Sequence, residues 1–450
     1  MGIKRKSIPS HHTALTLHLK CIGTSLPIIK KRPSLMNTTP TPKPFRFLRE
    51  EVYLLPTYEM ETPLYLSLLN AQSRVFPRGF LPPGDPLIRL PHPFETWEQT
   101  ADVLPKLALS RYIRSALEDL PPFQVQALQT LEEFERAMSM LSFMANMYVF
   151  APDHPVASAI PANLARAWYQ VAHRLDRLPM MTYASQVMYN WKRIHTDDPI
   201  EVGNLTMISN FLGGMDEEWF VTVHINIEAV AGRALGVIMP AQKAIVEGNI
   251  DQIVHSLKDL SQTLREMHGI LLRMPERCNP ETYYHRIRPY MFGWKNNPEL
   301  PEGMIYEGVE AYDGNPQQFR GETGAQSSVI YAFDGFLGIV HDYDEMRAYL
   351  YEMRDYMPVQ DRRFIEAVEQ GPSLRTFIMD HQQEGALLKK AYNESIEALY
   401  EFRKLHIEYA TLYIVKPAHH DQKGSVGTGG TPFTVYLKKH IDETLSHRFK

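Results

Sequence analysis

Apolar residues recur along most of this chain at three- and four-residue spacing, which is the pattern of amphipathic helices. Strict alternation of apolar and polar residues, which would indicate half-buried strands, is rare. The pattern therefore predicts an all-α fold. The segments that we expect to be helical are residues 94–109, 123–150, 164–190, 217–247, 250–274, 280–292, 325–340, 344–356, 362–369 and 384–415.

The length of the chain, 450 residues, exceeds what one compact core usually holds and predicts two domains. A polar stretch at residues 195–204 and the pair Gly213-Gly214 mark the expected boundary. We therefore predict a small helical domain over residues 46–210 and a large helical domain over residues 211–450.

The N-terminal segment differs in composition from the rest of the chain. The first acidic residue is Glu50, and ten lysines and arginines precede it together with scattered prolines. This composition predicts a disordered basic tail over residues 1–45. We expect a cytoplasmic protein, and the lack of acidic residues in the tail leaves mitochondrial targeting open as an alternative.

The composition of the whole chain excludes several classes of protein. The hydrophobic content of 44% and charged content of 22% are typical of a globular protein. A net charge of -5 gives no overall signature of nucleic-acid or membrane binding. Without a run of about 18 apolar residues, no helix is expected to span a bilayer. Cys21 and Cys278 are too few for a disulfide framework or a cysteine zinc site.

One predicted helix carries a histidine, His406, on its apolar face. An imidazole there, with an arginine one turn before it and a small residue one turn after it, suits an axial haem ligand. No C-x-x-C-H motif occurs, so such a haem would be held without thioether bonds. The alternative is a hydrogen-bonded core histidine. The face consists of Ile396, Leu399, Arg403, His406, Ala410 and Tyr413.

A second histidine, His224, lies within the apolar face of the helix predicted over residues 217–247. It is either a core histidine bonded to a backbone carbonyl or a polar group that faces the far side of a haem. Glu228 follows four residues later and could share an ion with it. Because no second histidine has the required spacing, we expect a surface ion pair instead.

Arg288 lies on a predicted helix among the aromatic residues Tyr283, Tyr284 and Tyr290. An arginine in such surroundings can bind a carboxylate through two parallel hydrogen bonds. The alternative is a salt bridge to an acidic neighbour.

Two loops are rich in small residues. The sequence GTGGT at residues 427–431 has no lysine after its glycines and follows no predicted strand, so it is neither a Walker motif nor a dinucleotide fingerprint. It is either a linker or a lid over a ligand. The loop that begins at Gly321 would let a flat cofactor lie against the backbone, although Thr323 or Ser327 can instead serve only as a helix N-cap.

Taken together, these segments resemble the indoleamine 2,3-dioxygenase family, haem enzymes that open the indole ring of tryptophan. The most specific signature is the ordered set of the GAQSS–FD–LGI segment, the R-x-x-H helix and the C-terminal GTGGT. The resemblance covers the chain apart from its basic tail. The matching stretches are GFLPPGDPLIRLP (79–91), PMMTYASQVMYNWK (179–192), WFVTVHINIEAVAG (219–232), GWKNNPELPEGMIYEG (293–308), FRGETGAQSSVIYAFDGFLGI (319–339), EFRKLHIEYATLYI (401–414) and KGSVGTGGT (423–431).

The resemblance implies one haem b per chain, ferrous in the active form, with His406 as the proximal iron ligand. It implies that Arg403 and Asp334 hold a haem propionate, that Arg288 binds the substrate carboxylate and that Thr428 contacts the substrate ammonium. His224 would accept a hydrogen bond from the indole N–H. The residues implied to line the indole pocket are Phe220, Tyr183, Val187 and Tyr283. The residues implied to lie at the haem edge are Thr323 and Gly324.

The implied reaction adds both atoms of O2 across the indole C2–C3 bond of L-tryptophan. The product would be N-formylkynurenine, in the first step of tryptophan catabolism through kynurenine towards NAD synthesis. An unidentified electron donor would keep the iron ferrous. We expect a monomer without nucleic-acid or membrane partners.

The chain departs from the family pattern in three places. A histidine stands at position 224, where the animal enzymes have serine and where microbial members and the related tryptophan 2,3-dioxygenase have histidine. Tyr283 replaces a phenylalanine, and Glu322-Thr323-Gly324 replaces Gly-Ser-Ala. These changes affect the expected substrate affinity more than the expected reaction.

Three other functions stay open. A haem dioxygenase acting on another indole derivative would agree with Tyr283 and Glu322. A non-enzymatic haem-binding or sensing protein would keep His406 but leave Arg288 and the GTGGT loop without a task. A purely structural helical protein would leave all three signature segments unexplained.

Overall fold

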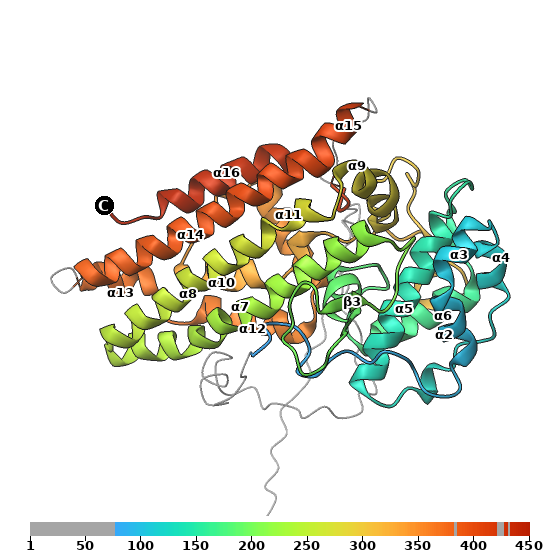
Figure 1. Cartoon of the computed structure of the whole chain (residues 1–450), viewed down its shortest axis with the longest axis horizontal. Coiled ribbons are helices and arrows are strands. Elements are labelled where there is room, and N and C mark those ends of the chain that lie inside the picture. The colour runs from blue at the N-terminus through green and yellow to red at the C-terminus, as the bar shows by residue number, and fades with distance from the viewer. Residues whose placement is uncertain (1–76, 382–384, 421–426, 431–432) are drawn as a thin grey trace, which may run out of the picture. The chain divides into compact units, whose positions relative to one another are not determined.

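The computed structural model describes residues 77–381, 385–420, 427–430 and 433–450, and all of these belong to one compact unit (Figure 1). The tail predicted over residues 1–45 lies outside the described residues. Helices dominate the described ranges, which confirms the predicted all-α class. The division into two domains near residue 210 stays a prediction.

The α-helices follow one another along most of the chain. They are α2 (Glu95–Asp102), α3 (Leu104–Leu109), α4 (Ile113–Glu118), α5 (Leu131–Val149), α6 (Ala162–Arg174), α7 (Met215–Glu247), α8 (Ile250–Leu271), α9 (Pro280–Thr282), α10 (Val329–Leu337), α11 (Glu345–Met353), α12 (Val359–Gln370), α13 (Leu374–Asp380), α14 (Ala386–Ala410), α15 (Lys416–His420) and α16 (Phe433–Ser446). Short 3₁₀ turns occur at η1 (Val125–Ala127), η3 (Met274–Glu276), η5 (Arg288–Met291), η6 (Glu310–Tyr312), η7 (Gly324–Gln326) and η8 (Arg354–Tyr356).

The longest helices pack on one another in series: α7 on α8, α8 on α14, and α14 on α16 (Figure 1). The bounds of α7 follow from its end residues. Asp216, Glu217 and Glu218 place three acidic side chains at the positive end of the helix dipole. Gly248, with a φ of 69°, ends the helix in the left-handed conformation that favours glycine. Asn249 then caps α8 by accepting a hydrogen bond from the backbone N–H of Gln252.

In the part of the chain that the structure describes, three segments are π-helical, and each lies beside candidate site residues. They are η2 (Ala184–Met188), η4 (Tyr283–Ile287) and η9 (Thr411–Val415). Single π-helical turns cost regular hydrogen bonding and occur often at functional sites. Regular helix was expected from the sequence in all three places, and that expectation is wrong in this detail.

Several predicted helices are shorter than expected. The helix predicted over residues 94–109 breaks after Asp102, because Pro105 has no backbone N–H with which to continue the turn. The helix predicted over residues 123–150 begins only after Thr130. The Thr130 hydroxyl accepts from the Glu133 N–H while the Glu133 carboxylate accepts from the Thr130 N–H, which forms a capping box. By contrast, the expected helix 217–247 agrees with α7 to within two residues.

Four short strands form two pairs among the described residues. β1 (Ala159–Ile160) pairs in parallel with β4 (Ile305–Tyr306), with Ala159 opposite Ile305. β2 (Trp191–Arg193) pairs antiparallel with β3 (Leu205–Met207), with Trp191 opposite Met207. The polar stretch at residues 195–204 connects β2 to β3.

Within the described ranges, α7 alone is long and apolar enough to cross a membrane by length and composition. No such helix was expected from the sequence. However, 67% of its most apolar window is buried in the protein, and Glu217 and Glu228 are buried on it. Both facts are typical of a core helix.

Candidate functional site

His406 lies near the C-terminal end of α14, and its side chain is exposed. The expectation of a buried ring is therefore wrong. Nevertheless, burial, together with the positive charges that His224 and Arg403 can carry, lowers the pKa of His406 to about 4. The ring is therefore accessible, yet it is surrounded by enough protein to disfavour its charged form. At neutral pH the ring is uncharged, so one nitrogen has a free lone pair.

One helical turn before His406, Arg403 donates a hydrogen bond from Nη2 to Oδ2 of Asp334 at 2.5 Å, across from α14 to α10. Burial tends to raise the pKa of Asp334, but Arg403 and His341 outweigh burial and hold this pKa below its usual range. The structure thus brings together the two residues that were predicted to hold one propionate. They are only partly exposed, so their interaction is screened less than a surface ion pair.

His224 faces the same region from α7. Its Nδ1 lies 2.7 Å from the carbonyl oxygen of Phe220. Because a carbonyl only accepts, Nδ1 carries the proton, and because burial lowers the pKa of His224, the ring is neutral. Nε2 is therefore left as a hydrogen-bond acceptor. The bond of Nδ1 to a backbone carbonyl agrees with the core-histidine interpretation. That Nε2 faces a ligand stays a prediction.

Aromatic rings surround His224. The ring of Phe220 lies 4.6 Å from His224 and 4.6 Å from Tyr283, and the ring of Tyr183 lies 6.2 Å from His224 in an edge-on arrangement. Val187 is fully buried on η2, which packs against α7. The structure therefore gathers Tyr183, Phe220 and Tyr283 around one imidazole, as the resemblance implied.

Arg288 begins η5 directly after the π-helical η4 and is 4% exposed. Its guanidinium lies 5.3 Å from the ring centre of Tyr284 and 4.7 Å from that of Phe292. Burial lowers its pKa, although the guanidinium stays charged at any physiological pH. A buried arginine held between aromatic faces is a cation fixed in place, and a guanidinium is the side chain best suited to bind a planar anion.

The described part of the GTGGT loop, residues 427–430, is held by hydrogen bonds to two other segments of the chain, one at Glu322 and one at Gly293. The Thr428 hydroxyl donates to the carbonyl of Glu322, and the Thr428 carbonyl accepts from the Gly293 N–H at 3.3 Å. Gly293 and Gly321 touch so closely that a Cβ on Gly293 would lie 2.1 Å from the Gly321 nitrogen. Thr428 therefore lies beside the segment after Arg288, where two glycines are required.

Thr323 and Gly324 lie at the start of η7. The Thr323 hydroxyl accepts from the Ala325 N–H at 3.4 Å, so Thr323 is the N-cap of this turn. Gly324 is exposed and presents backbone without a side chain. A structural role of Thr323 is thus confirmed, and its position at a haem edge stays a prediction.

Sequence reasoning missed the state of Glu228. The residue is 1% exposed and accepts a hydrogen bond from the Ser327 hydroxyl at 2.6 Å. The expected surface ion pair with His224 is therefore wrong, because Glu228 turns into the core. Burial raises its pKa to about 7, against the hydrogen bonds from Ser327 and Tyr183. Four-residue spacing shows that two side chains share a face but not which neighbours they meet.

Glu322, one of the departures from the family pattern, is 2% exposed, and its Oε2 has no hydrogen-bond partner among the described residues. Burial alone raises its pKa to about 8. Its charge, when present, raises the pKa of both Tyr183 and Tyr283, so it lies close to the aromatic group around His224.

We expect the stability of the protein to depend on the protonation of Glu322. Its folded pKa of about 8 exceeds the ordinary value of 4.5, so its contribution is fully present below about pH 4.5 and is lost as the pH rises through 8. Replacing it by Gln should flatten the fall in unfolding free energy over this range by an amount on the order of a few kcal/mol. Urea unfolding followed by circular dichroism at several pH values measures this. Glu302→Gln, at an exposed site, should leave the slope unchanged, and equal slopes in all three proteins would contradict the expectation.

The residues present fit a haem. Among the described residues neither ring nitrogen of His406 has a hydrogen-bond partner, and its neutral form can ligate iron. Arg403 supplies a cation at 2.5 Å from a carboxylate, and a Cβ added at Gly324 would meet no atom within 4 Å. His224 and Arg403 are close enough to influence the charge of His406.

The geometry defines an all-α protein with two neutral histidines on separate helices and a buried arginine among aromatic rings. The chain matches the family model described as Indoleamine 2,3-dioxygenase over residues 74–447. It therefore belongs to the indoleamine 2,3-dioxygenase family.

Curated relatives agree with this membership. The chain is 33% identical over 381 residues to human indoleamine 2,3-dioxygenase 2, which covers 82% of this chain and 92% of the relative. It is 32% identical over 387 residues to indoleamine 2,3-dioxygenase nanC of Aspergillus nanangensis, covering 82% and 94%. It is 30% identical over 417 residues to the indoleamine 2,3-dioxygenase of Saccharomyces cerevisiae, covering 82% and 91%.

Proposed function

We propose that this protein is a haem-dependent dioxygenase that converts L-tryptophan to N-formylkynurenine by inserting both atoms of O2 across the indole C2–C3 bond. Family membership supports the reaction class. The observation that carries the proposal for this chain is the neutral His406, with both ring nitrogens free of hydrogen bonds among the described residues, beside the Arg403–Asp334 pair. The bound haem supplies the redox chemistry with O2.

In this proposal His406 holds the iron and Arg403 binds a propionate. The ion pair with Asp334 fixes the guanidinium in place before the haem arrives, so less side-chain freedom is lost on binding. Asp334 in turn compensates the positive charge of Arg403, which is partly buried.

The buried Arg288 binds the substrate carboxylate through two charge-assisted hydrogen bonds and so orients the indole ring. The indole ring is lined by Phe220, Tyr183 and Tyr283, together with Val187 of η2. Thr428 contacts the ammonium end, since its loop is bound beside Gly293, five residues beyond Arg288. These contacts exclude water and fix one orientation of the substrate.

His224 accepts a hydrogen bond from the indole N–H at Nε2, the nitrogen that the bond to Phe220 leaves unprotonated. It does not need to remove that proton, because the pKa of an indole is far too high for an imidazole to compete. His224 is therefore a positioning group for the substrate ring.

We expect His224→Ala to weaken turnover without abolishing it. One neutral hydrogen bond contributes about 0.5–1.5 kcal/mol, so kcat/KM should fall by about 2- to 13-fold. Tryptophan with a methyl group on the indole nitrogen cannot donate this bond and serves as the matched control. The wild type and the variant should turn over that substrate at similar rates. A complete loss of activity with intact haem would contradict a positioning role.

The proposal is tested by supplying ¹⁸O2 to the haem-loaded, reduced protein with L-tryptophan and analysing the product by mass spectrometry. Incorporation of two labelled atoms into N-formylkynurenine is expected. Incorporation of one atom, or of none, would contradict a dioxygenase reaction.

A second candidate is the same reaction on another indole derivative. Tyr283 adds a hydroxyl and Glu322 adds a buried carboxyl near the aromatic group, and either can favour a substrate with an extra polar group. Relative kcat/KM values over a panel of tryptophan derivatives distinguish the two. We further propose a monomeric, cytoplasmic enzyme that depends on a separate electron donor.

A further inference from the structure

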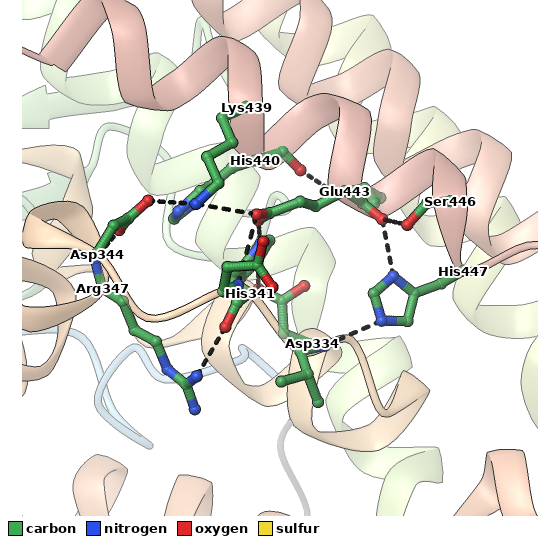
Figure 2. A network of polar contacts seen from close by, with 12 residues as sticks. Asp334, His341, Asp344, Arg347, Lys439, His440, Glu443, Ser446 and His447 are labelled. Atoms are coloured by element: carbon green, nitrogen blue, oxygen red, sulfur yellow. Dashed lines mark hydrogen bonds and ion pairs between the residues drawn. The ribbon is translucent and has the colours of Figure 1, made fainter.

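A second cluster of histidines lies apart from His406 and His224, where the chain after α10 meets α16 (Figure 2). His341 comes from the segment that follows α10, while His440 and Glu443 lie three residues apart on α16. Residues at this spacing share one face of a helix. Figure 2 shows that the side chains of all three residues point into one group.

The three side chains are close enough to bind one ion. Nδ1 of His341 lies 2.5 Å from Oε2 of Glu443, and the rings of His341 and His440 are stacked with centres 4.0 Å apart. One ligand atom from each of His341, His440 and Glu443 lies within 4.8 Å of the others. Ligand atoms of a tetrahedral zinc ion, each about 2.0–2.2 Å from the metal, lie about 3.3–3.6 Å from one another. On binding, the hydrogen-bonded atoms of His341 and Glu443 must therefore move apart, and any ligand atoms that lie farther apart must draw in.

The cluster is buried and incompletely bonded. His440 is 6% exposed and His341 is 9% exposed. Within the described residues, Nε2 of His440 has no hydrogen-bond partner, although a buried polar atom normally has one. A buried imidazole nitrogen left without a partner is what a bound metal would satisfy.

Residues next to the cluster are placed to hold the proposed metal ligands in position. Nε2 of His341 lies 3.6 Å from Oδ2 of Asp334, which places a carboxylate behind the imidazole as in carboxylate–histidine–metal arrangements. Lys439 lies 3.4 Å from Oε1 of Glu443 and 2.6 Å from Asp344, so it occupies the other oxygen of Glu443 and leaves Oε2 for a metal.

We propose that His341, His440 and Glu443 form a binding site for one divalent transition-metal ion, and that this ion is zinc, which other proteins bind through two histidines and a glutamate. This site is independent of the haem proposal in its ligands, but Asp334 joins it to Arg403. Protons and the metal compete for the imidazole nitrogens and the carboxylate, so the affinity should rise with pH.

The test is isothermal titration of the full-length, haem-loaded protein, without an affinity tag and after treatment with a chelator, with Zn²⁺. Co²⁺ serves as a second probe because its visible absorption reports the coordination geometry. One equivalent is expected to bind at micromolar or lower concentration. His440→Ala and Glu443→Gln should each weaken binding by at least about 10-fold. The near-isosteric Glu443→Gln guards against a folding defect, which circular dichroism checks.

His255→Ala is the matched control, because His255 is an exposed histidine that lies 3.5 Å from Asp259 on α8. It should bind Zn²⁺ as the wild type does. Absence of a tight equivalent, or an equivalent that both cluster variants retain, would overturn the proposal. So would loss of binding in His255→Ala alone.

Discussion

His406→Ala is expected to abolish stable haem binding. The loss of even an outer partner of a metal ligand commonly weakens metal affinity by about 10- to 100-fold, so the loss of the proposed iron ligand itself should cost more. The fold should survive, because the ring is exposed and has no hydrogen-bond partner among the described residues. Haem titration followed through the Soret band measures the affinity, and circular dichroism checks the fold.

Two controls separate the loss of a ligand from general damage. His419→Ala, at an exposed histidine on α15, should bind haem as the wild type does. Added imidazole should restore a Soret band to His406→Ala by occupying the space that the side chain leaves. An intact Soret band with unchanged turnover in His406→Ala would refute the assignment of the iron ligand.

Arg288→Ala is expected to cause the largest loss of turnover among variants that keep the haem. A desolvated substrate carboxylate would lose its charged partner, which costs about 2–5 kcal/mol and corresponds to a fall in kcat/KM from about 30-fold to several thousand-fold. Arg288→Lys should recover only part of this loss, because an ammonium lacks the planar pair of donors. Steady-state kinetics with L-tryptophan measures the effect.

The matched control is Arg286→Ala, at an exposed arginine of η4, the π-helical turn that directly precedes Arg288. It should leave kcat/KM nearly unchanged. Binding of tryptamine, which lacks the carboxylate, should differ little between the wild type and Arg288→Ala. If tryptamine and L-tryptophan lost equal affinity, Arg288 would serve the fold and not the carboxylate.

Local signals in the sequence predicted well the helix that has clear start and stop residues at its ends. The helix expected over residues 217–247 was predicted closely because acidic residues begin it and Gly248 ends it. The helix expected over residues 280–292 was not, because its π and 3₁₀ turns depend on how Tyr283 and Arg288 pack in the folded protein. Spacing along the chain cannot distinguish a regular helix from a π-helical turn.

In the candidate site, too, local spacing could be predicted from the sequence, and packing in the folded protein could not. Three-residue spacing on one helix was enough to place Arg403 near His406. The family resemblance assigned Arg403 and Asp334 to one propionate, and the structure adds the direct hydrogen bond between them. Exposure of His406 could not be predicted, because it depends on the space that other helices leave open. The pairing of His341 with His440 gave no signal, because nearly a hundred positions separate two residues that meet only in the folded chain.

The most direct test of the proposed function is the absorption spectrum of the haem-reconstituted, reduced protein, recorded with and without L-tryptophan in air. We predict a Soret band, followed by growth of the N-formylkynurenine absorption once L-tryptophan is added. A Soret band without product would contradict L-tryptophan as the substrate. The absence of a Soret band would contradict the haem site at His406 and with it the proposed function.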